Sequence, residues 1–211
     1  MAISYYPAMP DPSPKNSRTT AERILDAAED LFAEKGYSAT SLGDVADRVG
    51  IRSPSLYNHF RNKEALYGAV IDRLLEEFVA PLQELRDGVV SRERILQWLE
   101  TIVRMHHERP NLARLLQHAA LSGGPHTNEL IERLFSPMFD PTQSQAPDMA
   151  HWQVGPDLQP WAVMALNNMV MSYITMAPMY RDLLGEDPFS PEAEEKQLAL
   201  ILKVANLAMG N

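Results

Sequence analysis

The sequence predicts an all-α protein. Apolar residues recur at three- and four-residue spacing through most of the chain, as on one face of an α-helix. No segment shows the sustained alternation of apolar and polar residues that a half-buried strand requires. The chain has 211 residues, of which 45% are hydrophobic. It is therefore long enough for one large domain or two small ones, each with a proper core.

Composition excludes several classes of function. The chain has no cysteine, which removes disulfides, thiolate metal sites and cysteine nucleophiles. Nothing in it needs an oxidising compartment, so the cytoplasm is expected. Its net charge of −9, taken as a whole, argues against a DNA partner, because duplex DNA repels negative charge. Residues 1–16 are proline-rich and lack the regions of a signal peptide, so we expect a disordered arm there.

Four helices are expected in the first part of the chain, and the fourth is the longest. Each begins where a side chain can accept a hydrogen bond from a free backbone N–H group. These candidate caps are Thr19, with Glu22 completing a capping box, then Thr40 or Ser41, Ser53, and Asn62. Gly36 and Gly50 are expected to end the first and second helices.

Further helices are expected at 91–107, 110–121, 127–135, 161–176 and 192–209, with a loop over 136–155. The uncharged stretch from Leu158 to Tyr180 is long enough to raise the question of a membrane span. Prolines and asparagines interrupt it and no basic cluster flanks it, so a buried helix is the better interpretation and no membrane is expected.

The second and third helices are short and are separated by a tight turn at Gly50, which is typical of a helix-turn-helix. In the third helix Leu56 and Phe60 would face the core. Polar side chains suited to base edges and phosphates remain on the other faces: Ser55, Tyr57, Asn58 and His59. The alternative is a helical hairpin whose polar face only meets water.

The distribution of charge favours DNA binding. Between residues 48 and 63 there are four basic residues and no acidic one: Arg48, Arg52, Arg61 and Lys63. A phosphate backbone responds to charge within about 10 Å, so this local cluster matters more than the total. Residues 15–64 are neutral overall and residues 65–211 carry −8. The excess negative charge therefore belongs to the C-terminal part.

Three runs, 21–37, 40–51 and 55–66, resemble the TetR/AcrR family of transcriptional regulators, over about residues 18–68. The most specific part is Leu-Tyr-x-His-Phe-x-x-Lys-Glu-x-Leu at 56–66. The resemblance implies that Tyr57 and His59 meet the DNA backbone or base edges, that Lys63 meets a phosphate, and that Thr40 or Ser41 offers a hydroxyl to phosphate. In the turn, Arg52 and Ser53 depart from the usual order of serine then lysine, and Arg52 would contact a phosphate or a guanine.

The sequence thus predicts a helix-turn-helix domain at 17–64 and a helical domain at 65–211 that binds an effector and dimerises. The family's last two long helices form its dimer interface, and here we expect that role for Leu198, Ile201, Leu202 and Ala205. A mostly apolar effector pocket is expected from side chains on several helices. Its candidates are Trp98, Ile102, Met105, Leu116, Trp161, Met164, Asn168 and Met171, and ordinary core packing is the alternative for each.

The resulting expectation is a homodimeric repressor that binds a palindromic DNA operator and responds to a small molecule. No catalytic motif, metal site or cofactor site is found in the sequence. One alternative is a regulator whose C-terminal domain only dimerises or binds a protein; an apolar cavity of a few hundred Å³ would count against it. A helical-bundle enzyme is a further alternative, but it would need acid, base or metal-binding groups at credible spacing.

Overall fold

The computed structural model describes residues 18–86, 91–136 and 154–210, and every regular element in these ranges is helical. The expected arm at 1–16 and most of the expected loop at 136–155 lie outside the described residues. The elements are α1 (Thr20–Ala39), α2 (Leu42–Val49), α3 (Ser53–Tyr57), α4 (Lys63–Arg86), α5 (Arg92–Glu108), α6 (Asn111–Ser122), α7 (Thr127–Leu130), the π-helical η1 (Ile131–Phe135), the 3₁₀-helical η3 (Pro156–Leu158), α9 (Gln159–Thr175), α10 (Ala177–Leu184) and α11 (Pro191–Met209).

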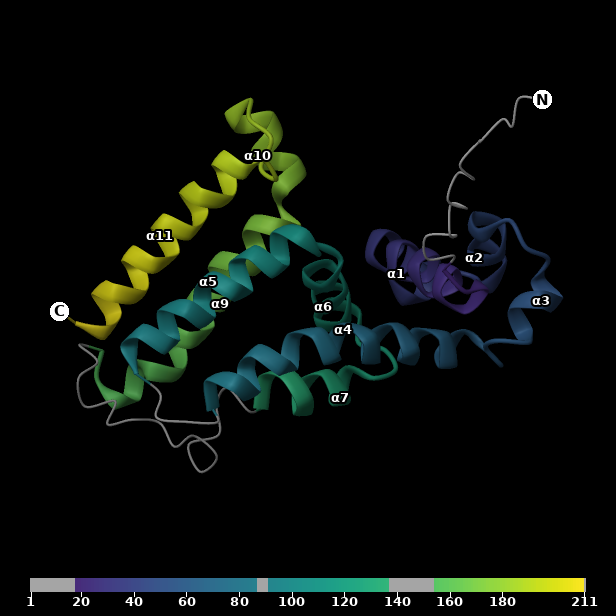
Figure 1. Ribbon diagram of the computed structural model, residues 1–211, viewed down its shortest axis with the longest axis horizontal. Helices are drawn as coiled ribbons and strands as arrows, with labels where there is room; N and C mark the ends of the chain where they lie inside the picture. Colours follow the sequence, from purple (N-terminus) through teal and green to yellow (C-terminus); the bar gives the residue numbers. More distant parts are fainter. Residues whose placement is uncertain (1–17, 87–90, 137–153, 211) are drawn as a thin grey trace, which may run out of the picture.

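Figure 1 shows the helices as two groups joined by α4. Helices α1 to α3 lie together at one end, while α5, α9 and α11 run side by side at the other. The first group shares a core with α4 and α6, in which Ile24, Phe32, Leu56, Leu74 and Leu115 are almost fully buried. The proposed domain boundary at residue 64 falls in the first turn of α4, so this helix belongs to both groups.

The second core lies between α5, α9 and α11. It buries Val103, Val170 and Ile201, together with Ala205 on the same face of α11. Burial of apolar side chains stabilises the folded state by about 25 cal/mol for each Å² removed from water. This packing, rather than local helix propensity, holds the C-terminal part together.

Three of the four predicted caps are confirmed, but Ser53 is not a cap: it is the first residue of α3, and Arg52, which precedes it, makes no capping hydrogen bond through its side chain. Thr19 and Glu22 form the expected capping box, and the Asn62 side chain accepts a hydrogen bond from the Ala65 N–H at 2.8 Å. The end of α1 differs from the expectation. Gly36 adopts a positive φ of 77° inside the element, and one more turn follows it before α1 ends at Ala39. A Cβ at Gly36 would lie 3.0 Å from Nδ1 of His118 on α6, so glycine is also required for close packing there.

One helix was not expected at all. The segment after α9 continues as α10, which has Pro178 in its first turn. Proline in the first turn of a helix gives up no hydrogen bond, because that N–H group has no partner within the helix. Pro178 therefore marks the start of a second helix, where only an interruption of one helix was expected from the sequence.

Candidate nucleic-acid interface and effector cavity

The turn between α2 and α3 is fixed by backbone hydrogen bonds. Ser41 and Asp44 form a capping box at the start of α2. At its end Gly50 adopts the left-handed conformation, with φ 75° and ψ 35°, and its N–H bonds to the Asp47 carbonyl. The Ile51 N–H bonds to the Ala46 carbonyl at 3.0 Å. This Schellman-type end needs a residue that tolerates positive φ, which explains the glycine.

Helix α3 is held by a single buried side chain, Leu56, which is fully covered by the core. The other predicted DNA-binding side chains in this region are exposed: Arg52, Ser53, Ser55, Tyr57, Asn58 and His59. Tyr57 is the clearest case, because 55% of this large ring faces solvent. The structure therefore presents one continuous polar and aromatic surface over α3, as a groove-binding helix requires.

Two guanidinium groups on this surface are exposed. Arg52 precedes α3 and Arg61 follows it. Arg48 is partly neutralised, since its Nη2 lies 3.5 Å from a carboxylate oxygen of Glu34. An exposed guanidinium group can donate charge-assisted hydrogen bonds to a phosphate or to a guanine base.

Thr40 does not fit its expected role. Its side chain is 2% exposed, and its hydroxyl hydrogen lies within reach of two backbone carbonyls, those of Gly36 at 2.9 Å and Leu31 at 3.1 Å. The hydroxyl therefore ties the end of α1 together and is not presented to phosphate. Ser41 is exposed, but its hydroxyl already donates to the Asp44 carboxylate while capping α2.

Lys63 is also committed within the chain. Its Nζ donates to the carbonyls of Tyr37 at 2.7 Å and Thr40 at 2.8 Å, with Ser38 at 3.3 Å. The same Nζ lies 4.3 Å from the centre of the Tyr37 ring. A cation at the carboxyl end of a helix satisfies its last carbonyls and opposes the negative end of the helix dipole. In this geometry the ammonium group of Lys63 caps the end of α1 and is not free to contact a phosphate.

A buried ion network that the sequence analysis missed connects this unit to the rest of the chain. Glu29 of α1 is only 5% exposed, and its Oε2 lies 2.5 Å from Nη2 of Arg73 on α4 and 3.2 Å from Nη2 of Arg109 beyond α5. Arg73 also pairs with Asp26. A signal was present, because Glu29 stands four residues after Leu25 and three before Phe32, within the apolar face of α1.

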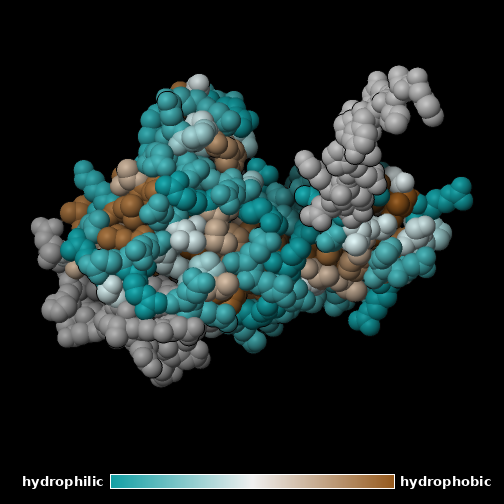
Figure 2. Space-filling model, viewed as in Figure 1, coloured by the Kyte–Doolittle hydropathy of each residue, from teal (hydrophilic) through white to brown (hydrophobic). Residues whose placement is uncertain are grey.

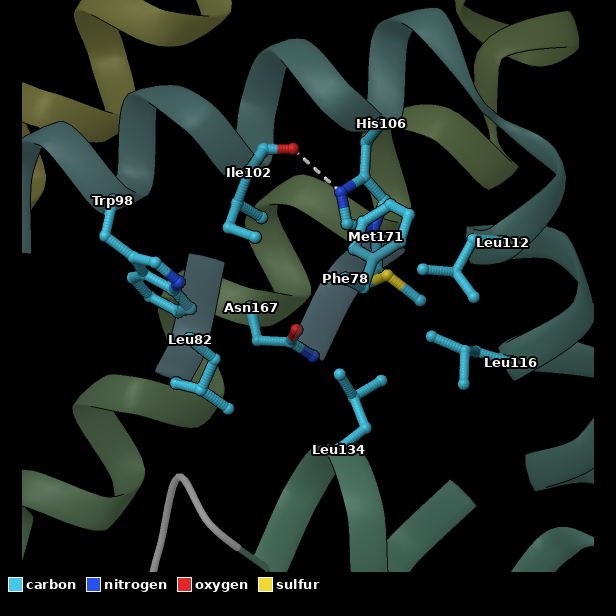
Figure 3. A pocket seen from close by; sticks show the side chains of 10 residues that line it. All are labelled: Phe78, Leu82, Trp98, Ile102, His106, Leu112, Leu116, Leu134, Asn167 and Met171. Carbon is cyan, nitrogen blue, oxygen red and sulfur yellow. Dashed lines mark hydrogen bonds between the residues drawn. The ribbon is translucent and has the colours of Figure 1, made fainter. Parts of the chain in front are cut away.

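A small cavity lies where α4, α5, α6 and α9 meet (Figure 3). The volume of this cavity is about 30 Å³. Ten side chains line it: Phe78, Leu82, Trp98, Ile102, His106, Leu112, Leu116, Leu134, Asn167 and Met171. Four of the expected pocket residues are therefore present, namely Trp98, Ile102, Leu116 and Met171.

The other four expected pocket residues lie elsewhere. Trp161 is 66% exposed and Met164 is 44% exposed, both on the outer face of α9. Asn168 is also exposed, and the neighbouring Asn167 faces the cavity instead. Met105 packs against the core of the N-terminal group. The error is one of helix phase, because a residue next in sequence points about 100° away around the helix.

His106 is the most perturbed polar group at the cavity. It is 4% exposed, its Nδ1–H donates to the Ile102 carbonyl at 2.8 Å, and its ring packs edge-on against Phe78. Burial away from water lowers the pKa of His106 to about 4, so the ring is neutral at pH 7. Its Nε2 is buried and has no hydrogen-bond partner among the described residues, and the same is true of Nε1 of Trp98.

The expected dimer residues are mostly internal. Leu198 is 5% exposed, Ala205 is 1% exposed and Ile201 is fully buried, because they form the core with α5 and α9; Leu202 is half-buried. The apolar residues that α11 exposes are Leu200 and Leu207, at 55% and 67%. Figure 2 shows hydrophobic side chains gathered over this part of the molecule. The broad apolar pattern of α11 is present, but three of the four residues expected at a dimer interface are buried in the core of this chain.

Residues 24–70 match the family model described as bacterial regulatory proteins, tetR family. This stretch of the chain is therefore similar to tetR-family regulatory proteins. Among curated proteins, the transcriptional regulator RutR of Escherichia coli K12 is 31% identical over 114 residues, which cover 53% of this chain and 54% of RutR. The chain thus matches only about half the length of this relative. Shorter matches include proteins named as repressors and one named as an activator.

Solved structures extend the likeness of fold beyond the tetR-family domain. AmtR of Mycobacterium smegmatis superposes with a TM-score of 0.65 at 22% identity, covering 94% of this chain and 91% of AmtR. SmeT in complex with triclosan superposes with a TM-score of 0.59 at 21% identity, covering 87% of this chain and 90% of SmeT. At this level of identity the agreement concerns the fold.

No helix in the described ranges is both long and apolar enough to cross a membrane. No group of three or more histidine, aspartate or glutamate side chains in those same ranges could hold a metal ion.

Proposed function

We propose that this chain is a DNA-binding transcriptional regulator, and a repressor, that binds a palindromic operator as a homodimer. The observation that carries the proposal is the exposed surface of α3, flanked by the exposed Arg52 and Arg61 and anchored by the buried Leu56. A tetR-family domain at residues 24–70 supports it, since the family is one of regulatory proteins and the relatives' names describe regulators rather than enzymes. Such a protein acts where the DNA is, in the cytoplasm of a bacterial cell.

In a symmetric dimer, two copies of α3 enter successive major grooves, about 34–36 Å apart along the DNA. The half-sites then repeat with two-fold symmetry and a spacing of about one helical turn. The exposed apolar residues of α9 and α11 supply the surface for the second copy, with Trp161 and Met164 on one helix and Leu200 and Leu207 on the other. Large apolar residues exposed on neighbouring helices commonly mark protein interfaces.

The test is a selection of duplexes from a random-sequence DNA library with the full-length protein. We expect enrichment of one sequence with two-fold symmetry and half-sites about one turn apart. Recovery of an asymmetric site would contradict the dimeric arrangement, and no enrichment over the starting library would contradict specific DNA binding.

Regulation by a small molecule is the second part of the proposal. The cavity is lined by Phe78 and Leu82 of α4, the helix that begins beside α3. A ligand that favours one position of α4 also favours one placement of the DNA-binding surface, with a coupling of typically 1–3 kcal/mol. The structural neighbour SmeT has been solved in complex with triclosan, so a protein of similar fold binds a small molecule, which supports this part of the proposal.

The small volume of the cavity favours the alternative in which the C-terminal part only dimerises or binds a protein. Pockets for drug-sized ligands usually measure about 300–1,000 Å³, against about 30 Å³ here. An effector therefore requires an open conformation of the same helices. The ligand experiment below separates the two possibilities.

A further inference from the structure

Two polar atoms on side chains that line the cavity have no hydrogen-bond partner among the described residues, although the rest of the lining is nearly all apolar. They are Nε2 of His106 and Nε1 of Trp98, both of which are inaccessible to solvent. Figure 3 shows the two rings on different sides of the cavity, with the Asn167 amide between them. Most buried polar groups in folded proteins are hydrogen-bonded, so two unpaired nitrogen atoms on side chains that line one cavity need an explanation.

The hydrogen-bonding roles of these atoms follow from their surroundings. The Nδ1 of His106 faces the Ile102 carbonyl at 2.8 Å, so Nδ1 carries the hydrogen and Nε2 is left as an acceptor. The indole nitrogen of Trp98 can only donate. A ligand that satisfies both must offer a donor to His106 and an acceptor to Trp98.

The charge of the lining limits the ligand further. None of the ten lining side chains is an aspartate, glutamate, lysine or arginine. A charged ligand would lose its hydration on entering the cavity and would find no opposite charge there, which is strongly unfavourable. The remaining surface, formed by leucines, Ile102, Phe78 and Met171, matches an apolar body.

We propose that the cavity binds an uncharged, largely apolar molecule bearing a hydroxyl group, which donates to Nε2 of His106, and that an oxygen of the same molecule accepts from Nε1 of Trp98. An apolar alcohol or phenol supplies the hydroxyl, and a second oxygen of the same molecule, such as an ether or a carbonyl, supplies the acceptor. The inference deepens the proposed function, because it names the class of effector. Ligand binding itself does not depend on the DNA-binding activity and can be measured without it.

Accommodating such a molecule requires the lining to move outward. Met171 is unbranched and repacks easily. Phe78 and Leu82 lie on α4, so their displacement would move α4, the helix that follows α3 in the chain. The cavity in its closed form is then the state without effector.

The test compares three matched probes on the full-length protein by titration calorimetry: 4-propylphenol, propylbenzene and 4-propylbenzoate. We expect saturable binding of the phenol, at least about tenfold weaker binding of propylbenzene, which lacks the hydroxyl, and no binding of the anion. In the ¹H–¹⁵N spectrum the indole resonance assigned by a Trp98→Phe variant should shift with the phenol. Equal affinity for phenol and propylbenzene, or no binding of the phenol, would overturn the proposal.

The variant His106→Phe removes the acceptor and keeps a ring against Phe78. It should lose the preference for the phenol while still binding propylbenzene, which shows that the cavity is intact. His107→Phe is the matched control, because His107 is adjacent in sequence but does not line the cavity. A preference that survives His106→Phe would assign the hydroxyl to another group and overturn the proposal.

A separate measurement keeps this inference distinct from the proposed function. The selected duplex is titrated with protein in the presence and absence of 4-propylphenol. A change in DNA affinity supports the regulatory role of the ligand. Binding of the phenol without any change in DNA affinity leaves the ligand site supported and contradicts its role as an effector site.

Discussion

Lys63 shows how one side chain acquires a role that its sequence context does not reveal. Its ammonium group contacts three carbonyls at the end of α1, 23 to 26 residues away in the sequence. It stands beside the exposed Arg61, which makes the two cations look equivalent in the sequence. The structure separates them into a helix cap and an exposed charge.

This difference predicts different effects for the two alanine variants. Lys63→Ala should lower the free energy of unfolding by about 1–2 kcal/mol, because the last carbonyls of α1 lose their donor. Arg61→Ala should change stability by less than about 0.5 kcal/mol and weaken DNA binding. Urea denaturation measures the free energy of unfolding of both variants. Equal stabilities of the two variants would show that the Lys63 contacts contribute nothing.

His106 makes a prediction about pH. Its pKa is about 4 in the folded protein, below the ordinary value of 6.5, because burial disfavours the charged ring. Between these values the unfolded chain binds a proton that the folded chain does not. The contribution of this group to stability is therefore complete above about pH 6.5 and is lost as the pH falls toward 4. The sign is the one expected for a histidine that is buried in its neutral form.

The test is the difference in unfolding free energy between pH 7 and pH 5. His106→Phe should lose less stability over this interval than the unsubstituted protein, and His107→Phe should behave like the unsubstituted protein. If His106→Phe showed the same loss, another group would be responsible for the acid sensitivity.

Much of the residue-level site could be predicted, and the failures have a physical cause. The exposed positions of α3 follow from local spacing around Leu56, so Tyr57, Asn58 and His59 were expected away from the core, and the structure exposes them. Thr40, Lys63 and Glu29 depend on partners far away in the sequence. Spacing within one segment contains no information about such partners.

At the scale of elements, two glycines within helices behave differently. A Cβ at Gly68 of α4 would lie 2.9 Å from the ring of His126, just before α7. A Cβ at Gly43 of α2 would come no closer than 3.5 Å to any atom, which is an ordinary contact. Gly68 is therefore needed for the approach of α7 to α4, whereas Gly43 has no such requirement.

Replacing each glycine with alanine tests this packing. Gly43→Ala should raise the free energy of unfolding by up to about 1 kcal/mol, the difference in helix propensity between the two residues. Gly68→Ala should forfeit that gain, because the ring of His126 must be displaced. Thermal unfolding compares the two. A gain at Gly68 as large as that at Gly43 would mean that α7 yields without cost.

Most helix starts were predictable because capping is local, although α3 begins at Ser53 without a side-chain cap. Helix faces were predictable only where the apolar stripe is narrow. From Leu198 to Met209 most residues of α11 are apolar, so its inner and outer faces cannot be told apart from spacing. In α9 the same breadth caused the phase error at Asn168. The packing of α5, α9 and α11 against one another determines which face of each helix is buried, and this packing exists only in the folded chain.

For the whole molecule, the exposed apolar residues of α11 predict a dimer that a single charge disrupts. Leu200→Glu should give a monomer in sedimentation velocity, because the carboxylate would be buried without a partner in the dimer. Leu121→Glu is the matched control, since Leu121 is 79% exposed and lies on α6. A Leu200→Glu protein with the sedimentation coefficient of the unsubstituted dimer would place the interface elsewhere.

The distribution of charge over the molecule agrees with one DNA-binding end. Residues 65–211 carry −8 and residues 15–64 carry none. Repulsion between the acidic part and DNA therefore favours approach through α3. The total of −9, which argues against DNA binding when taken alone, instead orients the molecule.

The central claim is that the surface of α3 binds operator DNA, and fluorescence anisotropy on the selected duplex tests it most directly. Arg52→Ala and Tyr57→Ala should each weaken binding about tenfold or more, with unchanged unfolding free energy and dimerisation. Arg181→Ala removes an exposed cation from α10 and should bind like the unsubstituted protein. Unchanged affinity in both α3 variants would contradict the account, because no contact with DNA would then pass through this surface.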